Sequence, residues 1–104
     1  MTKTIKYHET TDYKKNFNKL NKKFKTLVDD IEVAKKNSIE LFHLAEINNQ
    51  GIVLIPGYYH ENIQIYKLRK FACKALKGKG AKSGIRIIYD KKKKTLTVTL
   101  IEIY

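Results

Sequence analysis

Alternation of apolar and polar side chains, which begins at residue 63, is the pattern that most limits how this sequence can fold. The alternation runs through residues 63–71, 83–90 and 95–104, and lysine-rich connections separate these segments. A period of two residues is typical of a β-strand with one buried face. The sequence therefore predicts three consecutive strands that form an antiparallel meander.

The first half of the chain predicts a short strand followed by helices. Residues 5–9 alternate as a first strand would, and Thr11 or Asp12 fits the N-cap of the helix that follows. Apolar residues then recur at spacings of three and four, which places them on one face of a helix. These residues are Tyr13, Phe17, Leu20 and Phe24.

Together these elements predict an α+β fold in one domain that spans residues 1–104. The expected order is a short N-terminal strand, a helical hairpin over residues 12–46 that divides near Asn37 and Ser38, and the three-stranded meander. Residues 52–55 form a short buried segment, which the pattern leaves open between strand and helix. The hydrophobic content of 42% suits the small core of one such domain.

Composition also limits where the protein acts and what it binds. No apolar run approaches the roughly 20 residues that span a membrane, and no apolar stretch near Met1 resembles a signal peptide. Cys73 is the single cysteine, which excludes an internal disulfide and predicts a small buried residue rather than a nucleophile. His8, His43 and His60 show no metal-ligand spacing. We expect a cytoplasmic protein without metal, cofactor or membrane contact.

Most of the net charge lies in residues 67–94. This segment holds 12 Lys or Arg and one acidic residue, Asp90, so it carries +11 of the formal net charge of +12. Such a block creates a surface field that attracts polyanions and raises their rate of encounter. The charge pattern therefore indicates a partner that is nucleic acid or contains it.

Three cations of this segment are predicted to share one face of the meander. Lys67 and Arg69 lie two residues apart on one strand, and Arg86 lies on the next strand. A phosphate would relieve their mutual repulsion, and Arg can bind it through two parallel hydrogen bonds. The pattern fits equally well a solvated basic face or arginines paired with glutamates. The glutamates in question are Glu9, Glu61 and Glu102.

The connection between the first two strands of the meander has the composition of a phosphate-binding loop without its spacing. Residues 77–84 lack the pattern of Gly, four residues and Gly-Lys-Ser/Thr, and a strand follows instead of a helix. A cationic loop that contacts an RNA backbone and a merely solvated loop both remain open. The lysines of the RNA-binding interpretation are Lys70, Lys74, Lys77, Lys79 and Lys82. The four lysines at residues 91–94 predict a soluble hairpin turn.

Three stretches resemble a known family: IYKLRKF at residues 65–71, SGIRIIY at residues 83–89 and LIEIY at residues 100–104. An aromatic-Lys-apolar-basic strand, a Gly-apolar-Arg strand and an apolar last strand follow one another in this order. The sequence resembles the RelE/ParE superfamily of bacterial toxins, and the predicted order of elements extends the resemblance over nearly the whole chain.

This resemblance implies the toxin of a type II toxin–antitoxin system, whose partner is a cognate antitoxin protein. RelE-like members cut mRNA on the ribosome as mRNA interferases, whereas ParE-like members inhibit DNA gyrase. The basic residues of RelE-like active sites are matched by Lys67, Arg69 and Arg86, and Tyr104 matches an aromatic residue near the end of the last strand. Cleaving members usually add another basic residue there, and none follows Tyr104.

The resemblance favours a ribosome-dependent, metal-independent endoribonuclease. In that scheme Lys67 accepts the proton of a 2′-hydroxyl, and Arg69 and Arg86 stabilise the charge that develops on the phosphate. Tyr104 or a lysine donates a proton to the leaving 5′-oxygen. Two alternatives remain open: a gyrase inhibitor without catalysis, and a basic module that binds RNA or the ribosome.

Overall fold

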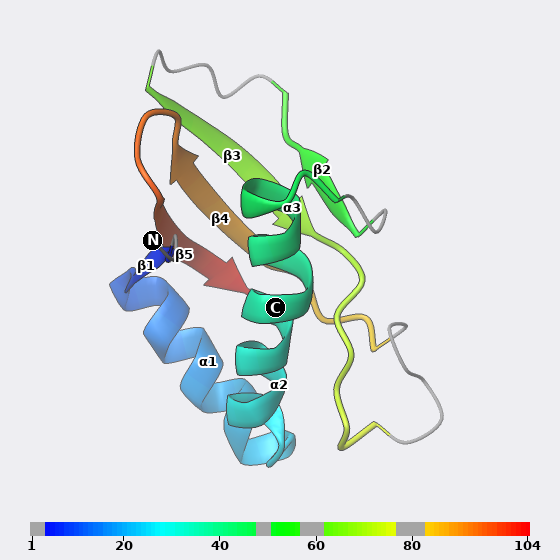
Figure 1. The fold of residues 1–104 in the computed structure, drawn as a ribbon. Helices are drawn as coiled ribbons and strands as arrows, with labels where there is room; N and C mark the ends of the chain where they lie inside the picture. Colours follow the sequence, from blue (N-terminus) through cyan, green and yellow to red (C-terminus); the bar gives the residue numbers. More distant parts are fainter. Residues whose placement is uncertain (1–3, 48–50, 57–61, 77–82) are drawn as a thin grey trace.

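The fold is a five-stranded sheet with helices on one face, as shown by a computed structural model that describes residues 4–47, 51–56, 62–76 and 83–104 (Figure 1). The elements in chain order are β1 (Lys6–Glu9), α1 (Thr11–Lys23), α2 (Leu27–Ala34), the π-helical turn η1 (Lys35–Glu40), α3 (Leu41–Leu44), β2 (Ile52–Leu54), β3 (Ile63–Leu68), β4 (Ile87–Lys92) and β5 (Thr97–Ile103). The predicted α+β class and the predicted order of elements are confirmed.

The predicted meander forms the centre of the sheet, whose strand order is β1-β5-β4-β3-β2. β3 pairs antiparallel with β4, and β4 pairs antiparallel with β5. β1 joins the last strand, β5, in a parallel pair, and β2 joins β3 at the opposite edge. The segment that the sequence left open between strand and helix is therefore an edge strand.

The strands occupy slightly different residues from those predicted. β3 ends at Leu68 and β4 begins at Ile87, so both strands are shorter at this end of the sheet than expected. Gly84 precedes β4 with a φ of 85°, a left-handed conformation that interrupts an extended strand. At the other end, Lys91 and Lys92 pair with β3 inside β4. The prediction that these two lysines belong to a turn was wrong.

The first helix is capped one residue earlier than predicted. Thr10, rather than Thr11 or Asp12, is the N-cap, and its Oγ1 accepts the Tyr13 N–H at 3.1 Å. The same hydroxyl donates to the carbonyl oxygen of Ile101 at 2.8 Å. A hydroxyl group can accept and donate at once, so this threonine joins the start of α1 to β5.

The helical hairpin also divides at a different place. The chain turns at residues 24–26, between α1 and α2, where the Phe24 N–H still bonds to the Leu20 carbonyl. Asn37 and Ser38, which were expected to end a helix, lie inside η1, and η1 continues α2 into α3. Of the helices in the described part of the chain, none is long and apolar enough to cross a membrane.

The helices lie on one face of the sheet (Figure 1). Alternate side chains of the sheet are buried and form the core together with helical residues. The buried side chains of the meander are Tyr66, Leu68, Ile87, Tyr89, Val98, Leu100 and Ile103. From the helices, Tyr13 and Leu27 are fully enclosed, whereas Phe17 packs against the core while remaining partly exposed. The apolar stripe of α1 therefore faces the sheet as predicted, although it is buried mainly through Tyr13.

Candidate functional site

The sheet face opposite the helices, called the open face below, carries most of the charged residues of the meander, whereas Lys91 pairs with Gln64 and Val98 on the helix side. In the register of the sheet, Lys67 stands opposite Ile88, and Ile88 stands opposite Glu102. Two residues further along, Arg86 and Tyr104 exchange two backbone hydrogen bonds, of 2.8 and 3.0 Å. Because side chains alternate along strands, Arg86 and Tyr104 lie on the same face as Lys67.

Arg86 is fixed to the backbone that carries Arg69. Its Nη1 donates to the Arg69 carbonyl at 2.8 Å and to the Ile85 carbonyl at 3.4 Å. Among the described residues, its other guanidinium nitrogens have no hydrogen bond, and no carboxylate forms a salt bridge with either arginine. Of the glutamates that the sequence offered as partners, Glu9 and Glu102 form no salt bridge with these arginines, and Glu61 lies outside the described residues. The guanidinium groups can therefore bind an anion.

Lys67 meets the predicted aromatic residue directly. Its ammonium nitrogen lies 5.7 Å from the centroid of the Tyr104 ring, which is the geometry of a cation–π contact. The Tyr104 side chain is 47% exposed, so the ring also presents a surface on which a base could stack. Lys67, Arg86 and Tyr104 thus lie on the open face, and the Arg86 guanidinium contacts the backbone of Arg69. These four residues are the ones assigned to catalysis from the sequence.

Two polar contacts hold the ends of the lysine-rich connection. Ser83 Oγ donates to the Phe71 carbonyl and accepts the Ile85 N–H at 3.2 Å, which joins the two strand ends next to Arg69 and Arg86. The predicted RNA-binding residues Lys70 and Lys74 are exposed beside these contacts. Their companions Lys77, Lys79 and Lys82 lie outside the described residues.

A buried carboxylate anchors the same connection to the helices. Asp30, 3% exposed, accepts the Thr26 hydroxyl at 2.7 Å and the Lys74 N–H at 3.1 Å. The Thr26 Oγ1 also accepts the Ala75 N–H at 2.9 Å. Cys73 is buried between these contacts, which confirms the predicted burial of its side chain. Lys74 is therefore held at its backbone by hydrogen bonds to the helices, while its side chain is exposed.

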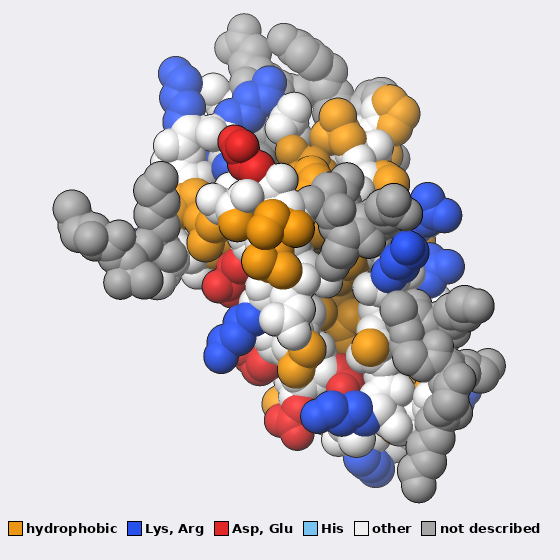
Figure 2. Space-filling view, turned by 45° about the vertical axis from the view of Figure 1, so that its right-hand side comes forward, with side chains coloured by type: hydrophobic (Ala, Val, Ile, Leu, Met, Phe, Trp, Pro, Cys, Tyr) orange, Lys and Arg blue, Asp and Glu red, His pale blue; other side chains and the backbone are white. Residues whose placement is uncertain are grey.

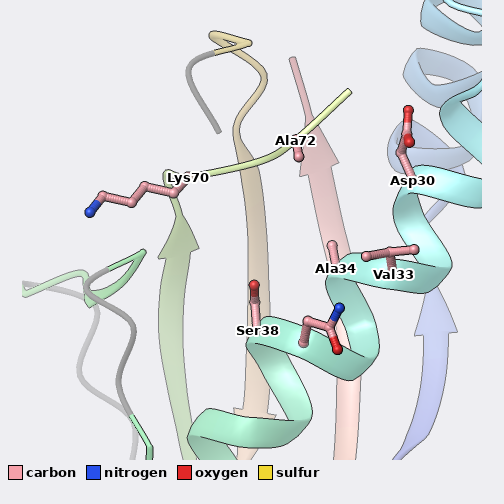
Figure 3. A pocket seen from close by; sticks show the side chains of 7 residues that line it. Asp30, Val33, Ala34, Ser38, Lys70 and Ala72 are labelled. Carbon is pink, nitrogen blue, oxygen red and sulfur yellow. The ribbon is translucent and has the colours of Figure 1, made fainter. Parts of the chain in front are cut away.

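A pocket of about 330 Å³ lies between α2–η1 and the chain that follows β3. Its lining residues are Asp30, Val33, Ala34, Asn37, Ser38, Lys70 and Ala72. Figure 3 shows that the Lys70 side chain extends away from the other labelled side chains of the lining. In Figure 2 hydrophobic side chains reach the surface next to Lys, Arg, Asp and Glu side chains. The pocket is separate from the charged open face.

Aromatic residues support the site from beneath. The Tyr66 and Tyr89 rings stack on the helix side of the sheet, with centroids 5.5 Å apart, and His43 Nε2 lies 2.9 Å from the Tyr89 hydroxyl. Burial lowers the pKa of His43 to about 4, with a smaller contribution from the positive charge of Lys91. Burial raises the pKa of Tyr89 above its ordinary range. These neutral groups pack the strands that carry Lys67 and Arg86.

Comparison with protein-family models and with curated proteins finds no match to this sequence. Comparison with solved structures finds a chain from the crystal structure of an archaeal RelE–RelB complex from Pyrococcus horikoshii OT3. The TM-score is 0.55 at 11% sequence identity, and the match covers 97% of this chain and 93% of that chain. The chain has a RelE-like fold. The fold predicted from three short stretches of sequence is thereby confirmed, and the open face described above belongs to a RelE-like sheet.

Sequence reasoning missed how β5 reaches the open face. The register shifts between Ile88 and Tyr89: Ile88 pairs with Glu102 and Tyr89 pairs with Leu100, which leaves Ile101 as an extra residue. This β-bulge moves Glu102 and Tyr104 to the open face and returns Ile103 to the core. The adjacent apolar residues Leu100 and Ile101, within an otherwise alternating strand, are the signal that could have revealed it.

Proposed function

We propose that this protein is the toxin of a toxin–antitoxin pair and that it cleaves mRNA on the ribosome without a metal ion. The observation that carries the proposal is the convergence of Lys67, Arg69, Arg86 and Tyr104 on the open face of a RelE-like sheet. An antitoxin protein is the expected partner, and the structural neighbour, which comes from a RelE–RelB complex, supports this. The acting compartment is the cytoplasm, where mRNA and ribosomes are found.

The geometry suits phosphoryl transfer at an RNA backbone. Cleavage builds negative charge on the phosphate, and fixed donors that point at this charge lower the barrier. Arg86 is held by its backbone and by Nη1, so its free nitrogens can donate without a large loss of side-chain entropy. Arg69 and Lys67 add positive charge from the neighbouring strand. The exposed Tyr104 ring can stack on the adjoining base.

Lysines beyond the catalytic group extend the RNA contact. Lys70 and Lys74 are exposed on the anchored connection after β3, and we propose that Lys77, Lys79 and Lys82 continue this basic surface along the same connection. Such contacts bind phosphates without reading sequence, so they position the RNA and do not select it. Because the antitoxin must neutralise this charge, we expect an acidic segment that covers Lys67, Arg69 and Arg86.

The test compares two variants that lose the same charge. Arg86→Ala removes a donor from the proposed site, and Lys93→Ala removes an exposed cation from the turn before β5. Mapping of mRNA 5′ ends after brief induction in a bacterium should show cleavage by the parent and by Lys93→Ala. Cleavage by Arg86→Ala should fall by about 10²–10³, the usual cost of one transition-state donor.

Three results would count against the proposal. Equal cleavage by all three proteins would remove Arg86 from the active site. Growth arrest without cleavage, accompanied by trapped DNA gyrase, would support a ParE-like gyrase inhibitor instead. Ribosome binding without growth arrest or cleavage would indicate a basic RNA-binding module.

A further inference from the structure

Two carboxylates share the open face with the cations: Asp90 on β4, which is partly buried, and Glu102 on β5, which is exposed and next to the row that holds Arg86 and Tyr104. Glu102 on β5 is exposed and stands two strands away from Lys67, with Ile88 between them. Among the described residues the salt bridge that forms is Lys35–Glu32, and Glu102 has no such partner. A carboxylate beside several cations would normally pair with one of them, so its unpaired position leaves it available to a ligand.

The backbone places Glu102 there by a specific distortion. Without the bulge at Ile101, strict alternation after the buried Leu100 would turn residue 102 toward the helices. Instead the bulge turns Glu102 outward, and the Ile101 carbonyl accepts the hydroxyl of Thr10 at 2.8 Å. Bulges of this kind often redirect a side chain at a functional site. The N-cap of α1 therefore holds the feature that presents Glu102.

We propose that Glu102 is the general base that accepts the proton of the attacking 2′-hydroxyl, an inference that rests on the proposed endoribonuclease function. A base must be unprotonated before the reaction, and a carboxylate meets this condition at neutral pH, whereas lysine and arginine ordinarily do not. The Lys67 ammonium nitrogen lies 5.7 Å from the centroid of the Tyr104 ring. Lys67 then acts as a cation and a proton donor.

The step balances without any further reactant. A Glu102 oxygen takes the proton from the 2′-hydroxyl, and the 2′-oxygen forms a bond to phosphorus. The bond between phosphorus and the 5′-oxygen breaks, and the leaving oxygen takes a proton from the Lys67 ammonium. The products are a 2′,3′-cyclic phosphate and a 5′-hydroxyl, while Arg69 and Arg86 neutralise the phosphate oxygens throughout. Proton exchange with water then restores Glu102 and Lys67.

The test is single-turnover cleavage on ribosomes programmed with a defined mRNA, using the whole chain. Glu102→Gln keeps the shape of the side chain and removes the base, so its rate should fall by about 10²–10⁴. Glu9→Gln, exposed on β1 away from the open-face cations, should cleave like the parent. Ribosome binding and the melting temperature should change little in either variant, because both side chains are exposed.

The pH dependence separates the two possible bases. With Glu102 as base, the parent rate should rise in the acidic range and reach a plateau below neutral pH; with Lys67 as base it should keep rising into the alkaline range. An alkaline rise, or a Glu102→Gln protein as fast as the parent, would overturn this inference and leave the endoribonuclease proposal intact. If the parent itself cuts no mRNA, both proposals fall.

Discussion

The two faces of the same sheet differ in what they require of their residues. On β3, Leu68 faces the helices and is fully buried, whereas its neighbour Lys67 lies on the open face and remains partly exposed. The buried face accepts only side chains that fill space among Tyr89, Leu27 and other apolar groups. The open face has no packing demand of this kind, so it can gather like charges whose repulsion a phosphate would relieve. Stability and function should therefore respond to different substitutions.

The largest expected effect is on nucleic-acid binding. If the basic surface around the open face contacts about six phosphates, affinity for single-stranded RNA should fall by about 10³ between 50 and 200 mM salt. Lys74→Ala should reduce the slope of log affinity against log salt, and Lys22→Ala in α1 should not. Fluorescence anisotropy at several salt concentrations measures the RNA affinity of each protein and the slope of log affinity against log salt. A slope that is unaffected by Lys74→Ala but reduced by Lys22→Ala would place the RNA on the helical side.

Lys67 and Leu68, which are adjacent on β3, test whether the two faces of the sheet respond differently to substitution. Leu68→Ala should lower the free energy of unfolding by about 2–5 kcal/mol, because it leaves a cavity in the core. Lys67→Ala should change it by no more than about 0.5 kcal/mol while impairing RNA cleavage. Urea denaturation of the two variants gives the free energies. If both variants lowered the free energy of unfolding equally, the Lys67 side chain would be packed against other groups of the protein.

Substitution of Asp30 tests whether hydrogen bonds to the helices stabilise the backbone at the start of the lysine-rich connection. Asp30→Ala removes the acceptor of the Thr26 hydroxyl and of the Lys74 N–H, and should cost about 1–3 kcal/mol of stability. Asp29→Ala, an exposed neighbour in α2, is the matched control. Hydrogen exchange at Lys74 should accelerate in the first variant and stay slow in the second. Unchanged protection at Lys74 would contradict the proposed anchoring.

The smallest expected effect is the change of stability with pH that arises from His43, on the helix side of the sheet. The pKa of His43 is about 4 in the folded protein and near 6.5 when the chain is unfolded, so the unfolded state binds more protons between these values. The His43 contribution is complete above pH 6.5 and is lost as the pH falls toward 4. Because His43 is only partly buried, we expect a change on the order of 1 kcal/mol. His43→Phe should flatten stability against pH, whereas the exposed His8→Phe should not.

Periodicity in the sequence was enough to predict the meander and the helical layer. The period of two in the last three strands and the spacings of three and four in the helices reflect which side chains are buried. Such patterns are visible among residues that are close in the sequence. The sequence also predicted the burial of Cys73. Its assignment of Lys67, Arg69 and Arg86 to one face depended on the same alternation, and in the structure Arg86 Nη1 donates to the Arg69 carbonyl.

Other features depended on partners distant in sequence, and only the tertiary structure decided them. The parallel pairing of β1 with β5, the N-cap at Thr10 and the anchoring of Lys74 by Asp30 each join residues that no local pattern connects. The bulge at Ile101 has the same origin, since the carbonyl of this unpaired residue in β5 accepts a hydrogen bond from the Thr10 hydroxyl at the start of α1. Local periodicity thus determined the elements and their faces, whereas long-range hydrogen bonds decided that Glu102 and Tyr104 stand beside the cations.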